Sequence, residues 1–191
     1  MRDILLTLFL GSALAVALRR PDIGALLWAW VSTMNPHTLT FGFARSLPWA
    51  MIIAIVTIFA FATTPSRRRG LPWSTGLMLM IGLVFWMSLT SLFSVNPSAD
   101  VLERWIFVMK VFLMLFLTLC VMRGRVDIER LIWVVAFSLA YYGIKGGIWT
   151  VLTGGGGRVW GPPGGMIAGN NELGAALVML MPWMYYLLAT T

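Results

Sequence analysis

Three cations and two asparagines are the side chains of this sequence with the clearest potential for binding chemistry. Lys110 and Lys145 are the only ionisable residues well inside long apolar runs, and Arg158 lies in a glycine-rich segment. A guanidinium is a planar, permanently charged set of donors that suits phosphate. Asn170 and Asn171 precede the last apolar run, where one amide can cap a helix while the other points outward. These five residues predict a site for a diphosphate attached to a lipid tail.

The glycine-rich segment, residues 153–172, can itself contribute to an anion site. Residues 154–169 contain eight glycines, whose backbone presents bare N–H groups that can close on an anion. It is not a nucleotide motif, because no Lys-Ser or Lys-Thr follows the glycines and the Gly-x-Gly-x-x-Gly spacing fails at Val159 and Trp160. The alternative interpretation is a flexible linker that carries an ordinary surface arginine.

The two lysines also admit two interpretations. At a rise of about 1.5 Å per residue, Lys110 lies roughly 7–8 Å beyond Trp105, and Lys145 lies roughly 10 Å before the end of its apolar run. Both ammonium groups can therefore snorkel to the nearer headgroups. Alternatively, they face the interior of a helical bundle and line a polar cavity, with Gly143, Gly146 and Gly147 allowing a ligand or another helix to approach closely.

Composition sets the class of protein that must position these residues. The chain has 191 residues, of which 59% are hydrophobic and 11% are charged, and its mean hydropathy is +0.85. Soluble domains are nearer 25% charged, so the sequence predicts an all-α, polytopic integral membrane protein. The net charge of +7 reflects arginines that flank apolar runs, which indicates membrane topology rather than a nucleic-acid partner. One histidine and one cysteine build neither a disulfide framework nor a metal site, and no cofactor is expected.

About six to seven transmembrane helices are predicted, with the glycine-rich loop before the last one. Pro48 and Pro72 suit a first helical turn, Ser98 and Asp127 resemble N-caps, and Gly124 resembles a helix stop. Pro182 should kink the last helix. The first two segments are short, and the first also imitates a signal peptide, so cleavage after it is an alternative. The candidate segments are residues 4–18, 23–34, 48–64, 72–93, 105–122, 130–152 and 173–189.

Arginine counting predicts the orientation of these segments. With the N-terminus outside and the side alternating at each segment, the inner loops hold eight arginines and the outer side holds four. The positive-inside rule selects this orientation over its reverse. The N-terminus moves inside if residues 4–34 cross only once, but every later loop keeps its side. The loop 153–172 therefore faces outward, to the periplasm of a Gram-negative cell.

Three stretches of the chain resemble a known family. They are "GRVWGPPGGMIAGNNELGAALVMLMPWMYYL", "ALRRPDIGALLWAWVSTMNPHTLTFGFA" and "SVNPSADVLERWIFVMK". They are similar to the N-terminal half of O-antigen ligase-like proteins, and more closely to the O-glycosylation ligases associated with exosortase A systems. The resemblance covers essentially the whole chain, which it identifies as residues 1–191 of an N-terminal transmembrane domain whose C-terminal ligase half is absent.

The resemblance implies a function in the bacterial inner membrane. Family members transfer a glycan from undecaprenyl diphosphate to a lipid or protein acceptor at the periplasmic face, without a metal. An arginine in the outer loop engages the diphosphate, and Arg158 matches it; Asn170 and Asn171 match the polar pair that begins the next helix. The family's acceptor-side histidine lies in a later loop, and His37 does not match it. The chain is thus expected to be the donor side of a ligase, with no catalytic residue assigned.

Two other functions remain open at this point. A transporter or flippase component for a lipid-linked anion would also use lysines in the outer half of the membrane, a proline-kinked helix and a glycine-rich break. A non-catalytic membrane scaffold would use Gly143, Gly146 and Gly147 for helix contacts. Alanine at Arg158 would leave the function of such a scaffold intact.

Overall fold

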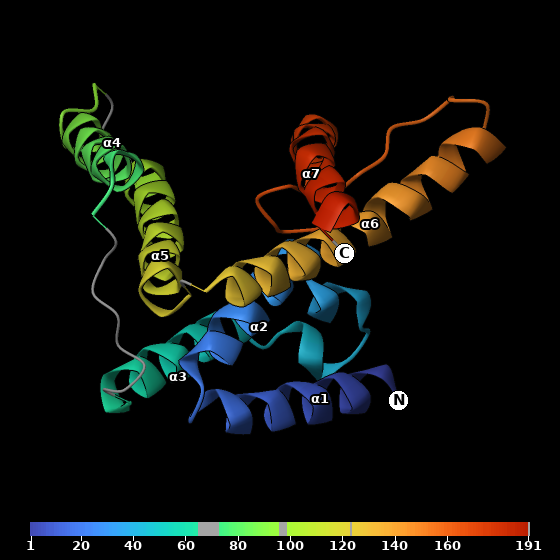
Figure 1. The fold of residues 1–191 in the computed structure, drawn as a ribbon. Coiled ribbons are helices and arrows are strands. Elements are labelled where there is room, and N and C mark those ends of the chain that lie inside the picture. Colours follow the sequence, from blue (N-terminus) through green and yellow to red (C-terminus); the bar gives the residue numbers. More distant parts are fainter. Residues whose placement is uncertain (65–72, 96–98, 123, 191) are drawn as a thin grey trace.

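The chain is all-helical, without strands, in the described part of a computed structural model, which comprises residues 1–64, 73–95, 99–122 and 124–190. Helices are joined by turns and by one longer loop (Figure 1). The α-helices are α1 (Arg2–Ala17), α2 (Pro21–Met34), α3 (Trp49–Thr63), α4 (Thr75–Leu92), α5 (Ala99–Val121), α6 (Arg125–Leu152) and α7 (Asn170–Thr190). Two short 3₁₀ helices, η1 (Pro36–Leu39) and η2 (Phe43–Arg45), lie between α2 and α3. Each of the seven predicted segments corresponds to one of the α-helices.

Four of these helices, α4 to α7, are long and apolar enough to cross a bilayer, and α3 is a shorter apolar helix. The four carry few buried residues, so most of their apolar surface is open to the surroundings. Such a surface is stable in a hydrocarbon solvent and not in water. The chain is therefore a membrane-embedded protein. The first two helices, of 16 and 14 residues, are shorter than the roughly 20 residues that a simple crossing needs.

Two of the predicted helix ends are wrong, and two cannot be compared. α6 begins at Arg125, so its N-cap is Gly124 and not Asp127. Gly124 has extended backbone angles (φ −77°, ψ 149°) that suit the start of a helix rather than a stop. The Asp127 carboxylate instead accepts the Gly124 N–H at 3.3 Å. Pro48 is the N-cap of α3, whereas Pro72 and Ser98 lie outside the described residues. α7 continues through Pro182.

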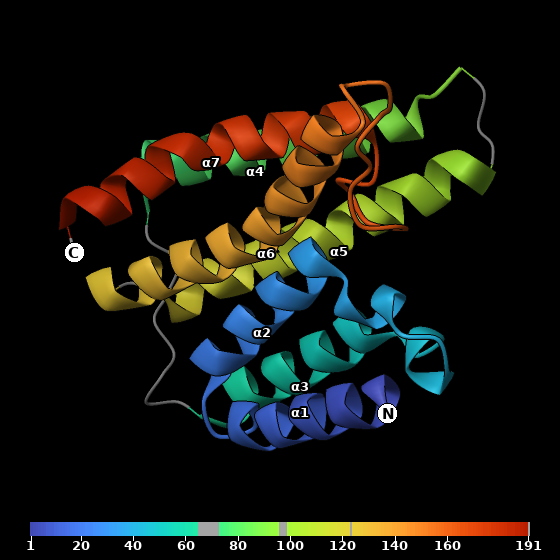
Figure 2. The same ribbon diagram turned by 90° about the vertical axis from the view of Figure 1, so that its right-hand side faces the viewer.

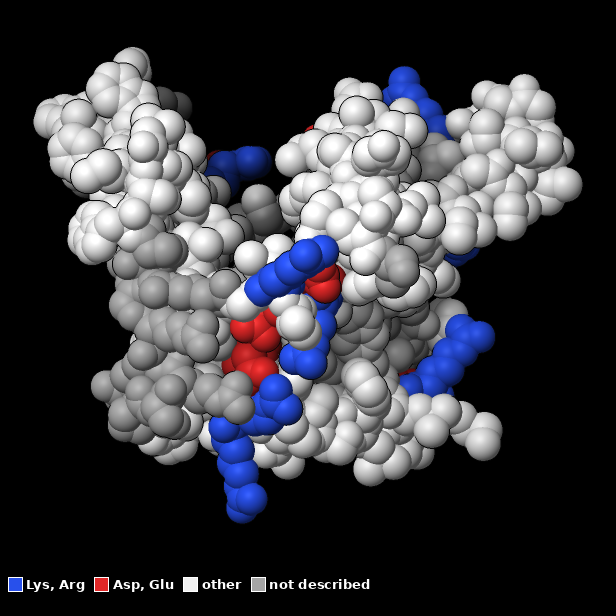
Figure 3. All heavy atoms as spheres, viewed as in Figure 1, with Lys and Arg blue, Asp and Glu red and all other residues white. Residues whose placement is uncertain are grey.

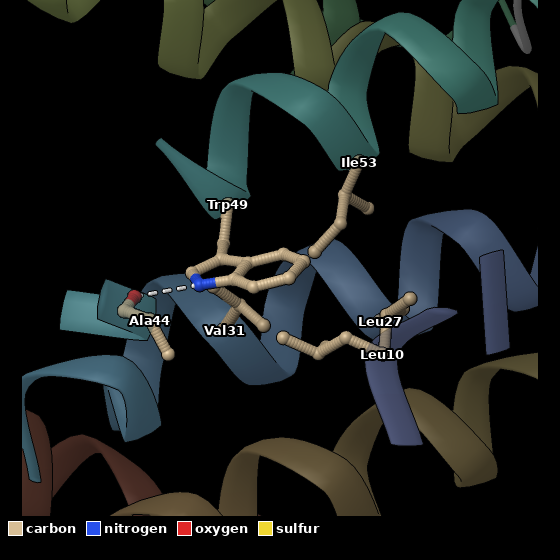
Figure 4. Packing of buried hydrophobic residues seen from close by; sticks show 6 residues of the cluster. All are labelled: Leu10, Leu27, Val31, Ala44, Trp49 and Ile53. Carbon is tan, nitrogen blue, oxygen red and sulfur yellow. Dashed lines mark hydrogen bonds between the residues drawn. The ribbon is translucent and has the colours of Figure 1, made fainter. Parts of the chain in front are cut away.

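The first three helices form one packed unit around Trp49 (Figure 4). The Trp49 indole is 5% exposed, and its Nε1–H donates to the Ala44 carbonyl at 2.8 Å. The cluster also contains Leu10 of α1, which is fully buried. Asp3 of α1 accepts the backbone N–H groups of Gly42 and Ala44 at 3.0 and 3.3 Å. These contacts make α1 part of the described fold.

α2 is the central helix of the structure, because α1, α3, α5 and α6 all pack against it. α2 and α3 approach closely where Gly24 lies against the side chain of Thr57. α4 packs on α5 and α7 packs on α6, so two arms rise from the α1–α3 unit. Figure 3 shows a hollow between these arms.

Successive helices run in opposite directions, so the structure has two ends (Figure 2). One end holds the N-terminus, the turn 35–48 and the loop 153–169, and we name it the loop end. The other holds residues 18–22, the start of α6 and the C-terminal end of α7, and we name it the charged end. This arrangement agrees with the alternation of sides predicted from the sequence.

Candidate functional site

The end of α2 organises the loop end. Asn35 terminates this helix in a left-handed conformation (φ 48°, ψ 53°), which asparagine tolerates better than most side chains. Its backbone N–H bonds back to the Val31 carbonyl, and its own carbonyl accepts the Thr38 hydroxyl at 2.7 Å. The Asn35 side chain is buried and cannot turn away into solvent. The turn after α2 is therefore a rigid platform.

The glycine-rich loop lies on this platform. The Asn35 amide donates to the Pro163 carbonyl at 3.4 Å, and Gly165 lies so close that a Cβ there would sit 2.8 Å from the Asn35 Nδ2. The loop also closes on itself, since the Gly161 N–H donates to the Ala168 carbonyl at 3.0 Å and Pro162 is fully buried. Residues 161–168 therefore lie against the turn that follows α2.

Lys145 lies on the face of α6 that meets α2. Ser138, Tyr142 and Lys145 share one stripe at helical spacing, and the Tyr142 hydroxyl donates to the Met34 carbonyl at 2.8 Å. Tyr142 and Ser138 are buried, but Lys145, one turn further along, is exposed. The side chain therefore starts beside the last turn of α2 and extends beyond it.

Arg158 lies over the last turns of the same helix. Its neighbour Gly157 lies against the Trp149 ring, and its other neighbour Val159 lies against Gly146. Trp149 follows Lys145 by four residues on one stripe of α6. The structure therefore brings Arg158 and Lys145 to the same end of α6. The Arg158 side chain is exposed.

Lys110 approaches the end of α2 from the other arm. It falls on the stripe of α5 that contains Met114, Leu117 and Val121, which are buried against α2 and α3. Those residues are covered, but Lys110 is exposed, one turn nearer the loop end. Because α5 runs away from the loop end and α2 runs toward it, this turn lies beside the C-terminal part of α2. Lys110 therefore lies on the side of α5 that packs against α2 and α3, and not on the opposite side of the helix.

The two asparagines lie within the first turn of α7 rather than before it. α7 begins at Asn170, and the preceding position is occupied by Gly169, so the prediction that one of them is the N-cap is wrong. Both are exposed. Glu172 turns back toward Gly169 and places a carboxylate beside this helix start, where the helix dipole favours negative charge.

The cations of the loop end lack acidic partners. Within the described residues, no ion pair joins an acid to Lys110, Lys145 or Arg158. His37 lies in η1, immediately after the Asn35 turn. Its Nδ1 is buried without a hydrogen-bond partner in the described chain, and burial lowers the pKa of His37 below its ordinary value of 6.5. His37 is therefore neutral near pH 7.

The charged end shows the opposite pattern. Arg20 pairs with the buried Asp22 at 2.7 Å. Arg125 pairs with Glu129 at 2.8 Å, and the Tyr186 hydroxyl of α7 donates to Glu129 at 3.3 Å. Arg130 lies 3.9 Å from Asp127. The sequence analysis did not identify this network, although the i,i+4 spacing of Arg125 and Glu129 was visible.

Asn35 and Tyr142 are the residues of the loop end that the sequence analysis missed. The sequence held weak signals for both, because Asn-Pro after a helix marks a turn and a tyrosine within an apolar run needs a partner for its hydroxyl. Neither signal identifies the partner, which lies 128 and 108 residues away in the chain.

Comparison with known proteins yields one family. The profile of a family of unknown function, DUF5935, matches residues 1–188. Comparisons with curated proteins and with solved structures give no match.

Proposed function

Because the chain belongs to the family of unknown function DUF5935, whose description assigns no activity, we propose its function from its own geometry. The loop end binds the diphosphate of a polyprenyl-diphosphate-linked glycan. The domain is the donor side of a ligase that transfers the glycan to a protein or lipid acceptor. The observation that carries the proposal is a set of three exposed cations on the loop-end parts of α5, α6 and the glycine-rich loop, none paired with an acid in the described chain.

The surroundings of these cations favour a lipid-linked anion over a free one. Lys110 and Lys145 belong to helices that are long and apolar enough to span the bilayer, and an ammonium on such a helix is stabilised by the headgroups, by a partner or by a polar cavity. A diphosphate at headgroup depth supplies the negative charge, and its polyprenyl tail remains in hydrocarbon.

Each residue has a distinct task in this proposal. Arg158 holds two phosphate oxygens through its guanidinium fork. Lys110 and Lys145 add point charges, and the amides of Asn170 and Asn171 add neutral donors. In the transfer, the acceptor oxygen bonds to the anomeric carbon as the carbon–oxygen bond to the diphosphate breaks. The diphosphate leaves with the electron pair, the acceptor proton passes to water, and the three cations stabilise the departing charge.

The proposal includes an orientation with six or seven crossings of the bacterial inner membrane and the loop end at the periplasm. The charged end carries Arg19, Arg20, Arg125 and Arg130, which suit the cytoplasmic side. Labelling of a single cysteine at position 158, with Cys120 replaced by serine, tests the sidedness. A membrane-impermeant maleimide should react from the periplasm, and reaction only after the membrane is opened would contradict the orientation.

Binding of undecaprenyl diphosphate to the purified protein tests the function. We expect Arg158→Lys to weaken binding roughly tenfold, because an ammonium cannot make the two parallel hydrogen bonds of a guanidinium. Arg45→Lys is the matched control, since Arg45 is also an exposed arginine of the loop end and has no role in the site. Equal affinities for the wild type and Arg158→Ala would exclude the site and favour a scaffold.

A further inference from the structure

A second candidate binding site lies between α6 and α7, near the charged end and away from the three cations. It is an apolar cavity of about 150 Å³. Trp133 and Phe137 stack with their ring centroids 5.1 Å apart and form one wall. The small side chains of Ala136 and Ala140 leave room for the cavity on α6. Its other wall consists of Met184, Leu187 and Leu188 of α7. Almost none of the lining surface is polar, so the site accepts hydrocarbon.

The size of the cavity is that of a short length of acyl chain. An apolar protein cavity of about 150 Å³ holds a benzene-sized hydrocarbon. Both walls belong to helices long and apolar enough to span the bilayer, so the cavity opens where lipid tails lie. Water would find no hydrogen-bond partners there.

Polar side chains lie at the end of the cavity nearest the charged end. Glu129 and Arg130 precede Trp133 by four and three residues, so all three share one side of α6. Glu129 is already held by Arg125 and by Tyr186. Arg130 remains half-exposed, and among the described residues its ion-pair contact is a long one, 3.9 Å to Asp127. Its guanidinium is thus free to bind a phosphate at the depth where headgroups lie.

We propose that this cavity and Arg130 form a binding site for an anionic phospholipid. One acyl chain occupies the space between Trp133, Phe137 and Leu187, and the lipid phosphate binds Arg130. The excess of arginine over acid at the charged end favours an anionic headgroup over a zwitterionic one. A lipid in this position bridges α6 and α7 beside the hydrogen bond between Tyr186 and Glu129. This site is independent of the diphosphate site proposed above.

Native mass spectrometry of the detergent-purified protein, with phosphatidylglycerol and phosphatidylcholine as the two probes, tests this proposal. The wild type should retain phosphatidylglycerol roughly tenfold better than phosphatidylcholine, since a charge-assisted hydrogen bond supplies a difference of that order. Arg130→Gln should abolish this preference, and Arg130→Lys should keep part of it. Ala140→Leu should reduce retention of both lipids, because it fills the cavity without changing the charge.

Two controls separate the site from general lipid adhesion. Arg45→Gln removes an arginine at the loop end, and Ala175→Leu enlarges an exposed residue of α7 outside the cavity; both should retain lipid like the wild type. Equal retention of the two lipids by the wild type would overturn the proposal. A preference that survived Arg130→Gln in a protein with an unchanged melting temperature would overturn it as well.

Discussion

The two ends of the helical bundle hold their charges in opposite ways. At the charged end, Arg20 and Arg125 meet acids within hydrogen-bond distance at the starts of α2 and α6, and Tyr186 joins α7 to Glu129 of α6. At the loop end, Lys110, Lys145 and Arg158 are exposed and have no acidic partner in the described chain. Ion pairs within the chain stabilise the fold, whereas cations without an acidic partner are available to bind an anionic ligand. Substitutions at the two ends should therefore affect different measurements.

The largest effect on stability is expected at the charged end. Asp22→Ala removes a buried carboxylate that pairs with the partly exposed Arg20, and the loss of such a charge-assisted hydrogen bond costs about 2 kcal/mol. Thermal unfolding in detergent should show this loss, while affinity for undecaprenyl diphosphate stays unchanged in the folded protein. The comparison fails if Asp22→Ala weakens ligand binding as strongly as Arg158→Lys does.

A pair of neighbouring glycines tests whether the docked loop matters. A Cβ at Gly146 would meet the side chain of Val159, whereas a Cβ at Gly147 has open space. Gly146→Ala should cost about 1–2 kcal/mol through overpacking, and Gly147→Ala should be neutral or slightly stabilising, as alanine favours helix. Amide hydrogen exchange of residues 157–161 should rise only in the first variant. Equal exchange in both would mean that the loop does not depend on this contact.

A substitution at Asn35 tests the hydrogen bond between the end of α2 and the glycine-rich loop, which we call the latch. Asn35→Gly keeps the left-handed backbone conformation at little cost but removes the hydrogen bond to Pro163, so we expect a loss of about 1 kcal/mol. Exchange around residues 161–168 should increase, and diphosphate binding should weaken because Arg158 is held less firmly. Thr33→Ala, near the end of α2 but bonded only within it, is the control. The latch is disproved if both variants show the same exchange.

The smallest expected effect is a pH dependence confined to the loop end. Burial lowers the pKa of His37 from 6.5, so the unfolded state binds the proton more readily than the folded one. Stability should therefore be fully present above about pH 6.5 and decrease as the pH falls below it. His37→Gln should remove this decrease without affecting the charged end. Identical pH profiles for the wild type and His37→Gln would show that another group is responsible.

Local patterns were sufficient for the class of protein and for the positions of its helices. Long apolar runs bounded by glycine, proline and arginine predicted segments whose limits lie within a few residues of α1, α2, α3, α4 and α7. The predicted starts of α5 and α6 were several residues too late. At α5, the polar residues Asp100, Glu103 and Arg104 belong to the helix although they precede its apolar run. At α6, the same holds for residues 125–129. Hydropathy detects the apolar part of a helix and not its polar ends.

The sequence by itself determined that Lys110, Lys145 and Arg158 lie toward one end of a membrane-embedded helical protein, since the alternation of apolar segments is a local property. Only the tertiary structure decided that both lysines lie on the stripes that face α2, that the glycine-rich loop rests on Asn35, and that Tyr186 of α7 meets Glu129 of α6. A helix that is apolar on every side carries no signal for the face that packs. Contacts between Asn35 and Pro163, or between Tyr142 and Met34, depend on how whole helices pack rather than on neighbouring residues.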